Sequence, residues 1–450
     1  MPPPQMPLVP DPPGPSALPS IPNTDADRQA MIRAVGVASV DDLFADIPPE
    51  HRRPSLSLPP PLSELELMAE LKALARRNRS AGEIACFLGA GAYRHFIPSV
   101  VGHILARSEF FTAYTPYQPE ISQGTLQSAF EFQSMVCELT GMDVANAGMY
   151  DGASALAEAC LMAANITGRR RIAVLSTVHP HYRDVLRTYA QGQGLTVTEL
   201  TPGQPTLTQE HACLAVQQPG FFGYLEDVAA LERAAHAAGA LYVVAADPIS
   251  LGLLKPPGEY GADVVVGEGQ SLGIPLSFGG PYLGLFACRK ELLRQMPGRI
   301  VGRTVDAQGR PGYVLTLQTR EQHIRRERAT SNICTSQQLL ALAAAVYLAT
   351  LGREGLREVA QLCYHKAHYA AGLIASRSGY SLQEGLFFKE FVVRCPRPPA
   401  EVNERLLEFG IMGGLDVSEQ IERGMLLCVT EMNSREEIEK LAAALGSVNG

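Results

Sequence analysis

The chain has 450 residues, which at about 150 residues per domain suggests two or three domains. It is 46% hydrophobic and 19% charged, which is typical of a chain that buries a large core. Its net charge of −8 gives no general attraction for nucleic acid or anionic membranes, so we expect neither as a partner. The most apolar run, residues 339–351, is shorter than the ~20 residues of a membrane span and predicts a core helix.

The N-terminal part of the chain is divided by proline. Ten prolines within the first 22 residues predict a disordered tail over residues 1–23, and this stretch lacks the positive start and apolar core of a signal peptide. Thr24 and Gly36 are typical of the two ends of a helix, and Ser39 begins a second short helix. After a proline-rich joint at residues 54–61, a leucine pattern over residues 65–74 predicts another helix.

The nine cysteines contain no C-x-x-C pair, which favours buried free thiols in a reducing compartment. We therefore expect a cytoplasmic protein. The cysteines are Cys86, Cys137, Cys160, Cys213, Cys288, Cys334, Cys363, Cys395 and Cys428.

From about residue 124, predicted helices alternate with short apolar runs. The helices cover residues 127–139, 152–164 and 225–238. The strands cover residues 172–176, 195–200, 213–217, 241–246, 263–266 and 283–288. Such a pattern predicts a mainly parallel sheet in a large α/β domain, which with the N-terminal helices spans residues 24–335. A long helix, two strands (389–395 and 424–430) and two further helices (399–409 and 434–445) predict a smaller α+β domain over residues 336–450.

Candidate ligand-binding residues lie at the ends of the predicted strands, where open α/β sheets bind their ligands. The helix start at residues 150–154, which includes Ser154, could bind an anion such as phosphate. His179 could stack on a planar ring, and Asp247 could meet a ring nitrogen. An ordinary helix cap, a surface histidine and a solvated aspartate are the alternative interpretations of these three positions.

Other kinds of site are not supported by the spacing of the residues. The pairs His179–His181 and His95–His103 lack the clustered second ligands of a zinc site, so we predict no metal. Residues 267–273 resemble a dinucleotide loop, but the third glycine comes one position late and the loop does not open the first βα unit.

Three long segments resemble signature blocks of the glycine decarboxylase P-protein, the pyridoxal-phosphate (PLP) component of the glycine cleavage system. They read FLGAGAYRHFIPSVV (87–101), AYTPYQPEISQGTLQSAFEFQSMVCELTGMDVAN (113–146) and VGRTVDAQGRPGYVLTLQTREQHIRRERATSNICTSQQ (301–338). The likeness runs from about residue 22 to the C-terminus and corresponds to the N-terminal half of that protein, which is a separate subunit in some bacteria. It implies an α/β fold like that of fold-type I PLP-dependent transferases, with a mainly parallel sheet and a smaller C-terminal α+β domain.

The resemblance also exposes a missing residue. Enzymes of this fold hold PLP as a Schiff base to a lysine that follows the strand after the aspartate. Here Gln270 and Ser271 stand at that position, and neither can form an imine. The six lysines lie elsewhere: Lys255 on a connecting loop, Lys290 after the next strand, and Lys72, Lys366, Lys389 and Lys440 outside the predicted sheet. A cofactor site made of Ser154, His179 and Asp247 is therefore predicted to be vestigial.

The resemblance then implies a subunit of glycine dehydrogenase (decarboxylating) that does not anchor PLP and is inactive alone. Its partner would be a second subunit that binds PLP covalently, in a heterodimer or heterotetramer. Together they would decarboxylate glycine and pass the aminomethyl group to the lipoylated H-protein. Two alternatives remain: a purely structural scaffold subunit, and a free-standing PLP enzyme that uses Lys255.

Because fold-type I sites form at a dimer interface, the resemblance implies that this chain contributes residues to its partner's active site. A stiff polar block at residues 114–124 supplies Tyr114, Tyr117, Glu120 and Ser122. A second block, just before the long helix, supplies Thr330, Ser331 and Asn332, and Thr330 or Ser331 is expected to reach the PLP phosphate. A self-satisfied loop and a helix cap are the respective alternatives.

Overall fold

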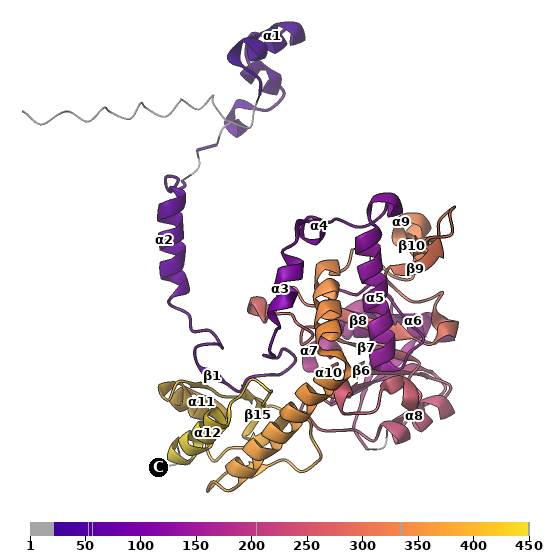
Figure 1. Cartoon of the computed structure of the whole chain (residues 1–450), viewed down its shortest axis with the longest axis vertical. Coiled ribbons are helices and arrows are strands. Elements are labelled where there is room, and N and C mark those ends of the chain that lie inside the picture. The colour runs from indigo at the N-terminus through magenta and orange to yellow at the C-terminus, as the bar shows by residue number, and fades with distance from the viewer. Residues whose placement is uncertain (1–21, 53, 56, 204, 334, 449–450) are drawn as a thin grey trace, which may run out of the picture. The chain divides into compact units, whose positions relative to one another are not determined.

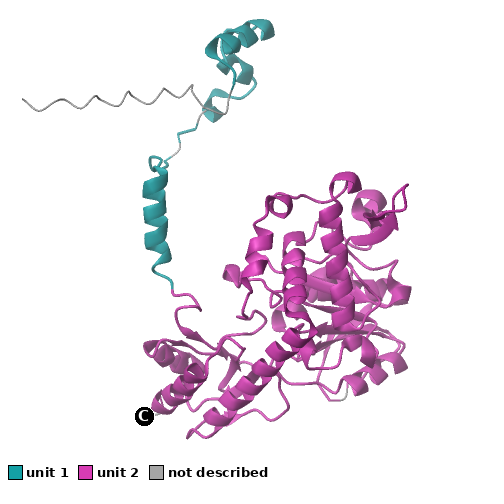
Figure 2. Ribbon diagram, viewed as in Figure 1, with its two compact units in different colours: residues 1–78 teal, residues 79–450 magenta. Residues whose placement is uncertain are grey.

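The computed structural model describes residues 22–52, 54–55, 57–203, 205–333 and 335–448. The chain forms two compact units, residues 1–78 and 79–450 (Figure 2). The predicted disordered tail, apart from its last two residues, lies outside the described residues.

The first unit contains the helices α1 (Asp25–Val35) and α2 (Glu64–Ala75). Thr24 caps α1 as predicted: its side chain accepts the backbone N–H of Asp27, whose carboxylate accepts the N–H of Thr24. Ser63 and Glu66 form the same capping box at the start of α2. The short helix expected after Ser39 is a 3-10 turn, Asp41–Phe44.

The second unit contains all the strands and the remaining helices of the described chain (Figure 1). The helices are α3 (Ser99–Leu105), α4 (Ser108–Phe111), α5 (Gln123–Thr140), α6 (Gly152–Thr167), α7 (Pro180–Gly192), α8 (Val228–Ala237), α9 (Gln322–Arg325), α10 (Gln338–Ala375), α11 (Pro399–Glu408) and α12 (Arg435–Val448). The strands are β1 (Ala85–Cys86), β2 (Val144–Ala145), β3 (Arg171–Leu175), β4 (Thr196–Leu200), β5 (His211–Gln218), β6 (Leu241–Ala246), β7 (Val264–Glu268), β8 (Gly284–Cys288), β9 (Ile300–Val305), β10 (Pro311–Thr316), β11 (Ser381–Leu382), β12 (Glu390–Arg394), β13 (Ile411–Met412), β14 (Leu415–Asp416) and β15 (Gly424–Cys428).

A seven-stranded sheet with the order β2-β8-β7-β6-β5-β3-β4 forms the centre of the unit. The five strands from β7 to β4 are mutually parallel, and β8 and β2 extend that sheet in antiparallel fashion. The mainly parallel α/β sheet predicted from the sequence is therefore confirmed. Strands β3, β5, β6, β7 and β8 are almost entirely buried, which is why they read as continuous apolar runs.

The parallel strands bring their carboxyl ends to one edge of the sheet, and this edge positions the candidate site. Strand β6 ends just before Asp247, β7 ends at Glu268, and His179 follows β3 as the N-cap of α7. Helix α6 packs along β5 to β8 and begins, at Gly152, against Glu268.

A smaller four-stranded antiparallel sheet has the order β11-β12-β15-β14 and its own core, packed against α11, α12 and the C-terminal half of α10. Strand β1 pairs in parallel with β13, and Phe87 bonds to both Met412 and Cys428. The first signature block therefore starts at the smaller sheet.

The long helix α10 is the one described helix whose length and composition would suit a membrane span. It bends at Gly352, and its first half contributes Ala341, Ala343, Ala344 and Tyr347 to the main core. It is the core helix that the sequence predicts.

The antiparallel hairpin β9–β10 was not predicted. It lies within the third signature block and packs on α5, where the Gln133 side-chain amide bonds to both the N–H and the carbonyl of Val301. Most residues of the two strands are exposed or only partly buried, and apolar and polar residues do not alternate regularly along them, so the strand signal is weak.

We expect Gly223→Ala to destabilise the second unit. Gly223 has φ +89°, and an added Cβ would overlap the backbone carbonyl of Glu390 at the start of β12. The free energy of unfolding should fall by at least about 2 kcal/mol. The control is Gly372→Ala at an exposed position of α10, where nothing lies within 4 Å of the added Cβ. There we expect no loss, or a gain of up to ~1 kcal/mol. Equal denaturant midpoints for the two variants would contradict the prediction.

Candidate functional site

Asp247 does not face open space, because Lys389 of the smaller sheet reaches it. The Lys389 Nζ lies 2.7 Å from Asp247 Oδ2, and the lysine side chain is 2% exposed. Burial lowers the pKa of Lys389, but the Asp247 carboxylate and smaller contributions from Cys428 and Cys363 together raise the pKa above its usual value. Lys389 lies outside the large sheet, but its side chain reaches the site at the end of β6, which the sequence analysis did not predict. Asp247 also accepts the N–H of Ile249, so its carboxylate is fully engaged.

The start of α6 is likewise satisfied from within the chain. The Glu268 carboxylate accepts the N–H of Gly152 at 3.0 Å, and also those of Gln270 and Leu283. The N–H of Ser154 donates to the side chain of its N-cap, Asp151. The backbone donors that could bind a phosphate at this helix start thus already meet two carboxylates.

Three aromatic side chains, those of Tyr93, Tyr182 and His179, lie between Asp247 and the start of α6. The Tyr93 ring lies 3.5 Å from Lys389 Nζ, and the Tyr182 hydroxyl lies against Gly152. His179 stacks on Tyr182; it donates through Nε2 to the carbonyl of Ala90 and accepts the N–H of His181 at Nδ1. Burial lowers the pKa of His179 to about 4, so the ring is neutral at pH 7.

The cavity left among these residues has a volume of about 30 Å³. A cavity that holds one benzene ring is about 150 Å³. The space beside Asp247 therefore does not fit a pyridine ring with its substituents.

The two residues at the missing lysine's position are buried. Gln270 donates to the carbonyls of Tyr93 and Ile274 and accepts the N–H of Tyr93, so it ties the first signature block to the strand end. Ser271 is 3% exposed, and its hydroxyl has no partner within the described chain. Lys255 is exposed and does not line the cavity at Asp247.

His95 acquires the clustered neighbours that its sequence spacing did not show. Its Nδ1 lies 2.7 Å from Glu431 Oε2, and Cys363 Sγ donates to the same oxygen. Potential ligand atoms of these three residues lie within 4.8 Å of one another. However, Lys389 Nζ lies 3.3 Å from His95 Nε2, and an ammonium at that distance disfavours a second cation.

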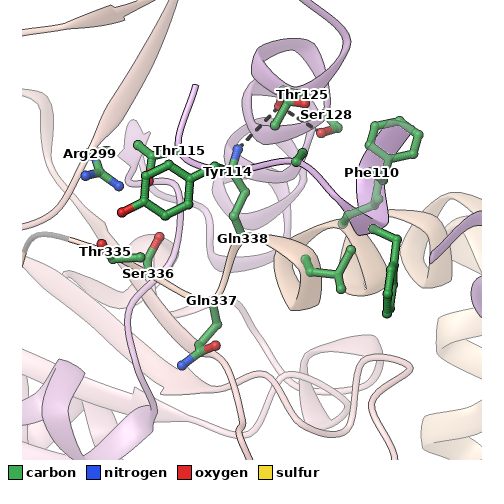
Figure 3. Close-up of a pocket in the computed structure, with 14 residues that line it drawn as sticks. Phe110, Tyr114, Thr115, Thr125, Ser128, Arg299, Thr335, Ser336, Gln337 and Gln338 are labelled. Carbon is green, nitrogen blue, oxygen red and sulfur yellow. Dashed lines mark hydrogen bonds between the residues drawn. The ribbon is translucent and has the colours of Figure 1, made fainter. Parts of the chain in front are cut away.

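Tyr114 and Thr115, from the first predicted block (residues 114–124), line a cavity of about 250 Å³ near the start of α10 (Figure 3). Tyr114 is 78% exposed and lies there among Thr115, Arg299, Thr335 and Ser336. Gln338 closes one side by donating to the carbonyl of Thr125.

Arg299 fixes the position of Tyr117, which belongs to the block at residues 114–124. The Arg299 side chain is 6% exposed, lies 3.8 Å from the Glu321 carboxylate and donates to the hydroxyl of Tyr117 at 2.8 Å. Tyr117 is thus oriented, although it is exposed, as are Tyr114 and Glu120. Ser122 is the N-cap residue of α5 and is only partly exposed.

The second contributed block does not join the first. Thr330, Ser331 and Asn332 line a separate cavity of about 550 Å³ with Tyr150 and Glu158. The hydroxyl residues beside Tyr114 are instead Thr335 and Ser336. The structure therefore brings together Tyr114 and Tyr117 with Arg299, which the sequence reasoning missed, and leaves residues 330–332 apart from them.

The chain has the fold of fold-type I PLP-dependent enzymes. It resembles a sphingosine-1-phosphate lyase from Burkholderia pseudomallei (TM-score 0.63, 16% identity, 88% of this chain and 93% of that one). It also resembles a cysteine desulfurase from Escherichia coli (TM-score 0.58, 16% identity, 87% and 99%). At such identities the likeness concerns the fold alone.

The particular family follows from closer relatives. Residues 19–445 match the family model described as glycine cleavage system P-protein, so the chain belongs to that family. Similar proteins named probable glycine dehydrogenase (decarboxylating) subunit 1 occur in Thermomicrobium roseum (54% identity, 94% of this chain, 98% of the relative) and Desulforamulus reducens (55%, 95%, 99%). A crystal structure of an inhibitor-bound glycine decarboxylase (P-protein) matches with a TM-score of 0.90 and 47% identity, covering 95% of this chain and 99% of that one.

The cavity around residues 330–332 yields a pH prediction. Burial raises the pKa of Glu158 from 4.5 to about 7, so between these values the folded chain holds a proton that the unfolded chain releases. The stabilisation from this protonated group is complete below pH 4.5 and is lost as the pH rises through 7. Glu158→Gln removes the dependence, so its stability relative to the parent chain should improve by up to ~3 kcal/mol between pH 5 and pH 8.

Thermal unfolding at both pH values measures this difference. Glu138→Gln, at an exposed position of α5, controls for the loss of one negative charge. A Glu158→Gln effect that does not change with pH would contradict the burial argument.

Proposed function

We propose that this chain is the subunit of glycine dehydrogenase (decarboxylating) that does not anchor PLP. The cofactor is bound covalently by a second subunit, which pairs with this chain as a heterodimer or heterotetramer. The complex decarboxylates glycine and transfers the aminomethyl group to the lipoylated H-protein. The names of the relatives, which specify a subunit 1, support a second subunit. The eight free cysteines of the described chain, six of them buried, fit a cytoplasmic location.

The filled strand-end site carries this proposal. Lys389 forms an ion pair with Asp247, and Glu268 accepts the N–H of Gly152 at the start of α6. The remaining cavity of about 30 Å³ is too small for the cofactor. Gln270 and Ser271 stand where the family resemblance places a Schiff-base lysine, and neither can form an imine. These observations support the vestigial interpretation of Ser154, His179 and Asp247 as far as cofactor binding is concerned.

What this chain supplies, in our proposal, is surface for its partner. PLP on the partner subunit provides the electron sink for decarboxylation. The block at residues 114–124 offers exposed hydrogen-bonding side chains, and Phe96, Phe111 and Ile121 are exposed as well. An exposed apolar and aromatic set of this kind is typical of an interface, and we assign it to the second subunit.

The two alternatives differ in how well the structure supports them. A free-standing PLP enzyme would need Lys255, which lies outside the Asp247 cavity. A pure scaffold has no need of the Arg299 guanidinium that orients Tyr117 towards an exposed surface. We therefore favour a subunit that completes its partner's site.

The first test separates the chain from the complex. The full chain alone should bind no PLP and release no CO₂ from glycine. With the second subunit and lipoylated H-protein, CO₂ release should appear. Borohydride reduction and peptide mapping should find pyridoxyl-lysine in the second subunit alone. A pyridoxyl group on any lysine of this chain, Lys255 included, would overturn the proposal.

The second test concerns the contributed residues in the assembled complex. Thr330→Ala with Ser331→Ala removes one hydrogen bond to a charged acceptor, about 1.5–3 kcal/mol, so PLP should be held about ten- to a hundredfold less tightly. Tyr114→Ala should lower glycine turnover by about ten- to a hundredfold with PLP content unchanged, because that side chain faces substrate. Tyr117→Phe and Glu120→Gln should act in the same direction as Tyr114→Ala.

Matched variants decide which hydroxyls act. Thr335→Ala with Ser336→Ala is compared with the 330/331 pair, because the former lie beside Tyr114. Tyr369→Ala on α10 controls for the loss of an exposed tyrosine. Full activity and full PLP content in all contributed-residue variants, with assembly intact, would favour the scaffold alternative.

A further inference from the structure

We propose that the strand-end site is filled by the chain's own side chains, without any ligand: Glu268 takes the place of a bound anion, and Lys389 takes the place of a bound cation and joins the two sheets. The inference concerns this chain's own architecture and holds whether or not the complex has the activity proposed above.

The anion position lies at the start of α6. A helix start with free N–H groups favours a negative charge, and Gly152, Gln270 and Leu283 direct three backbone N–H groups at one carboxylate. Glu268 comes from the end of β7 and needs no movement of the chain to reach them. The Tyr182 hydroxyl covers Gly152, so no room is left there for a second anion.

The cation position lies at the end of β6. Asp247 meets the Lys389 ammonium, which also lies 3.5 Å from the centre of the Tyr93 ring. A carboxylate on one side and an aromatic face on another are the two kinds of group that stabilise a buried cation. Lys389 supplies this cation from the smaller sheet, where it immediately precedes β12.

The same contacts connect the sheets. Lys389 Nζ also lies close to His95 Nε2, and His95 Nδ1 is in hydrogen-bond contact with Glu431, which follows β15. Glu431 in turn accepts a hydrogen bond from the Cys363 thiol on α10. Glu390, which directly follows Lys389 in the chain, accepts hydrogen bonds from the N–H of Ala90 and the hydroxyl of Tyr93. A continuous set of buried polar contacts thus runs from β6 of the large sheet to β12 and β15 of the smaller one.

The test uses hydrogen exchange of β12 and β15 in the full chain, with one variant for each position. Lys389→Ala leaves Asp247 buried and unpaired, and the opening equilibrium of these strands should rise by roughly a hundred- to a thousandfold. Propylammonium, which matches the deleted atoms, should restore protection, and inorganic phosphate should not. Glu268→Ala leaves three N–H groups without an acceptor: that of Gly152 at the start of α6, and those of Gln270 and Leu283. Phosphate should restore protection of α6 in that variant, and propylammonium should not.

Controls make each outcome decisive. Lys440→Ala, at an exposed lysine, should not change exchange of β12 or β15. Lys389→Met with Asp247→Asn removes both charges together and should be much milder than Lys389→Ala, since neither charge is then left alone. The unmodified chain should gain no protection from PLP. The proposal would be overturned if either ion restored protection in both variants, or if neither ion restored protection in either variant. It would also be overturned if PLP increased protection of the unmodified chain.

Discussion

The contact between Lys389 and Asp247 determines how the rest of the strand-end site is arranged. A charge buried alone costs several kcal/mol, so Lys389 and Asp247 stabilise each other. Their meeting fixes the start of β12 against the end of β6 and places Glu390 beside Ala90 and Tyr93. Gly223 must then lack a side chain, because the Glu390 backbone lies directly against it.

The large sheet could be predicted because its strands are buried on both faces and therefore read as continuous apolar runs. The hairpin β9–β10 could not, since its exposed residues carry no such signal. Within the site, Asp247 and His179 were found because they follow predicted strands directly. Lys389 was missed because about 140 residues separate it from Asp247, and no local pattern encodes a contact between two sheets. The one available signal was a charged pair, Lys389–Glu390, inside the apolar run from Phe387 to Val393.

The two contributed blocks show a similar limit. Both were selected by composition, and composition cannot say which hydroxyls share a cavity with Tyr114. The structure places Thr335 and Ser336 there and directs residues 330–332 towards Glu158 instead. Arg299 was missed because it belongs to neither block, yet its buried guanidinium orients Tyr117. A side chain that positions another from beneath the surface rarely has a recognisable sequence context.

A chain that loses a cofactor must do more than lose the residue that bonds to it. The fold of this family still directs backbone N–H groups of α6 and a carboxylate at β6 into one space, and polar groups buried without partners are strongly destabilising. Removing a lysine alone would leave these groups unsatisfied. Glu268 and Lys389 satisfy them, and the cavity that remains has a volume of only about 30 Å³. The contacts that satisfy these buried groups therefore also narrow the space beside Asp247, while Tyr114, which does not take part in this packing, remains exposed.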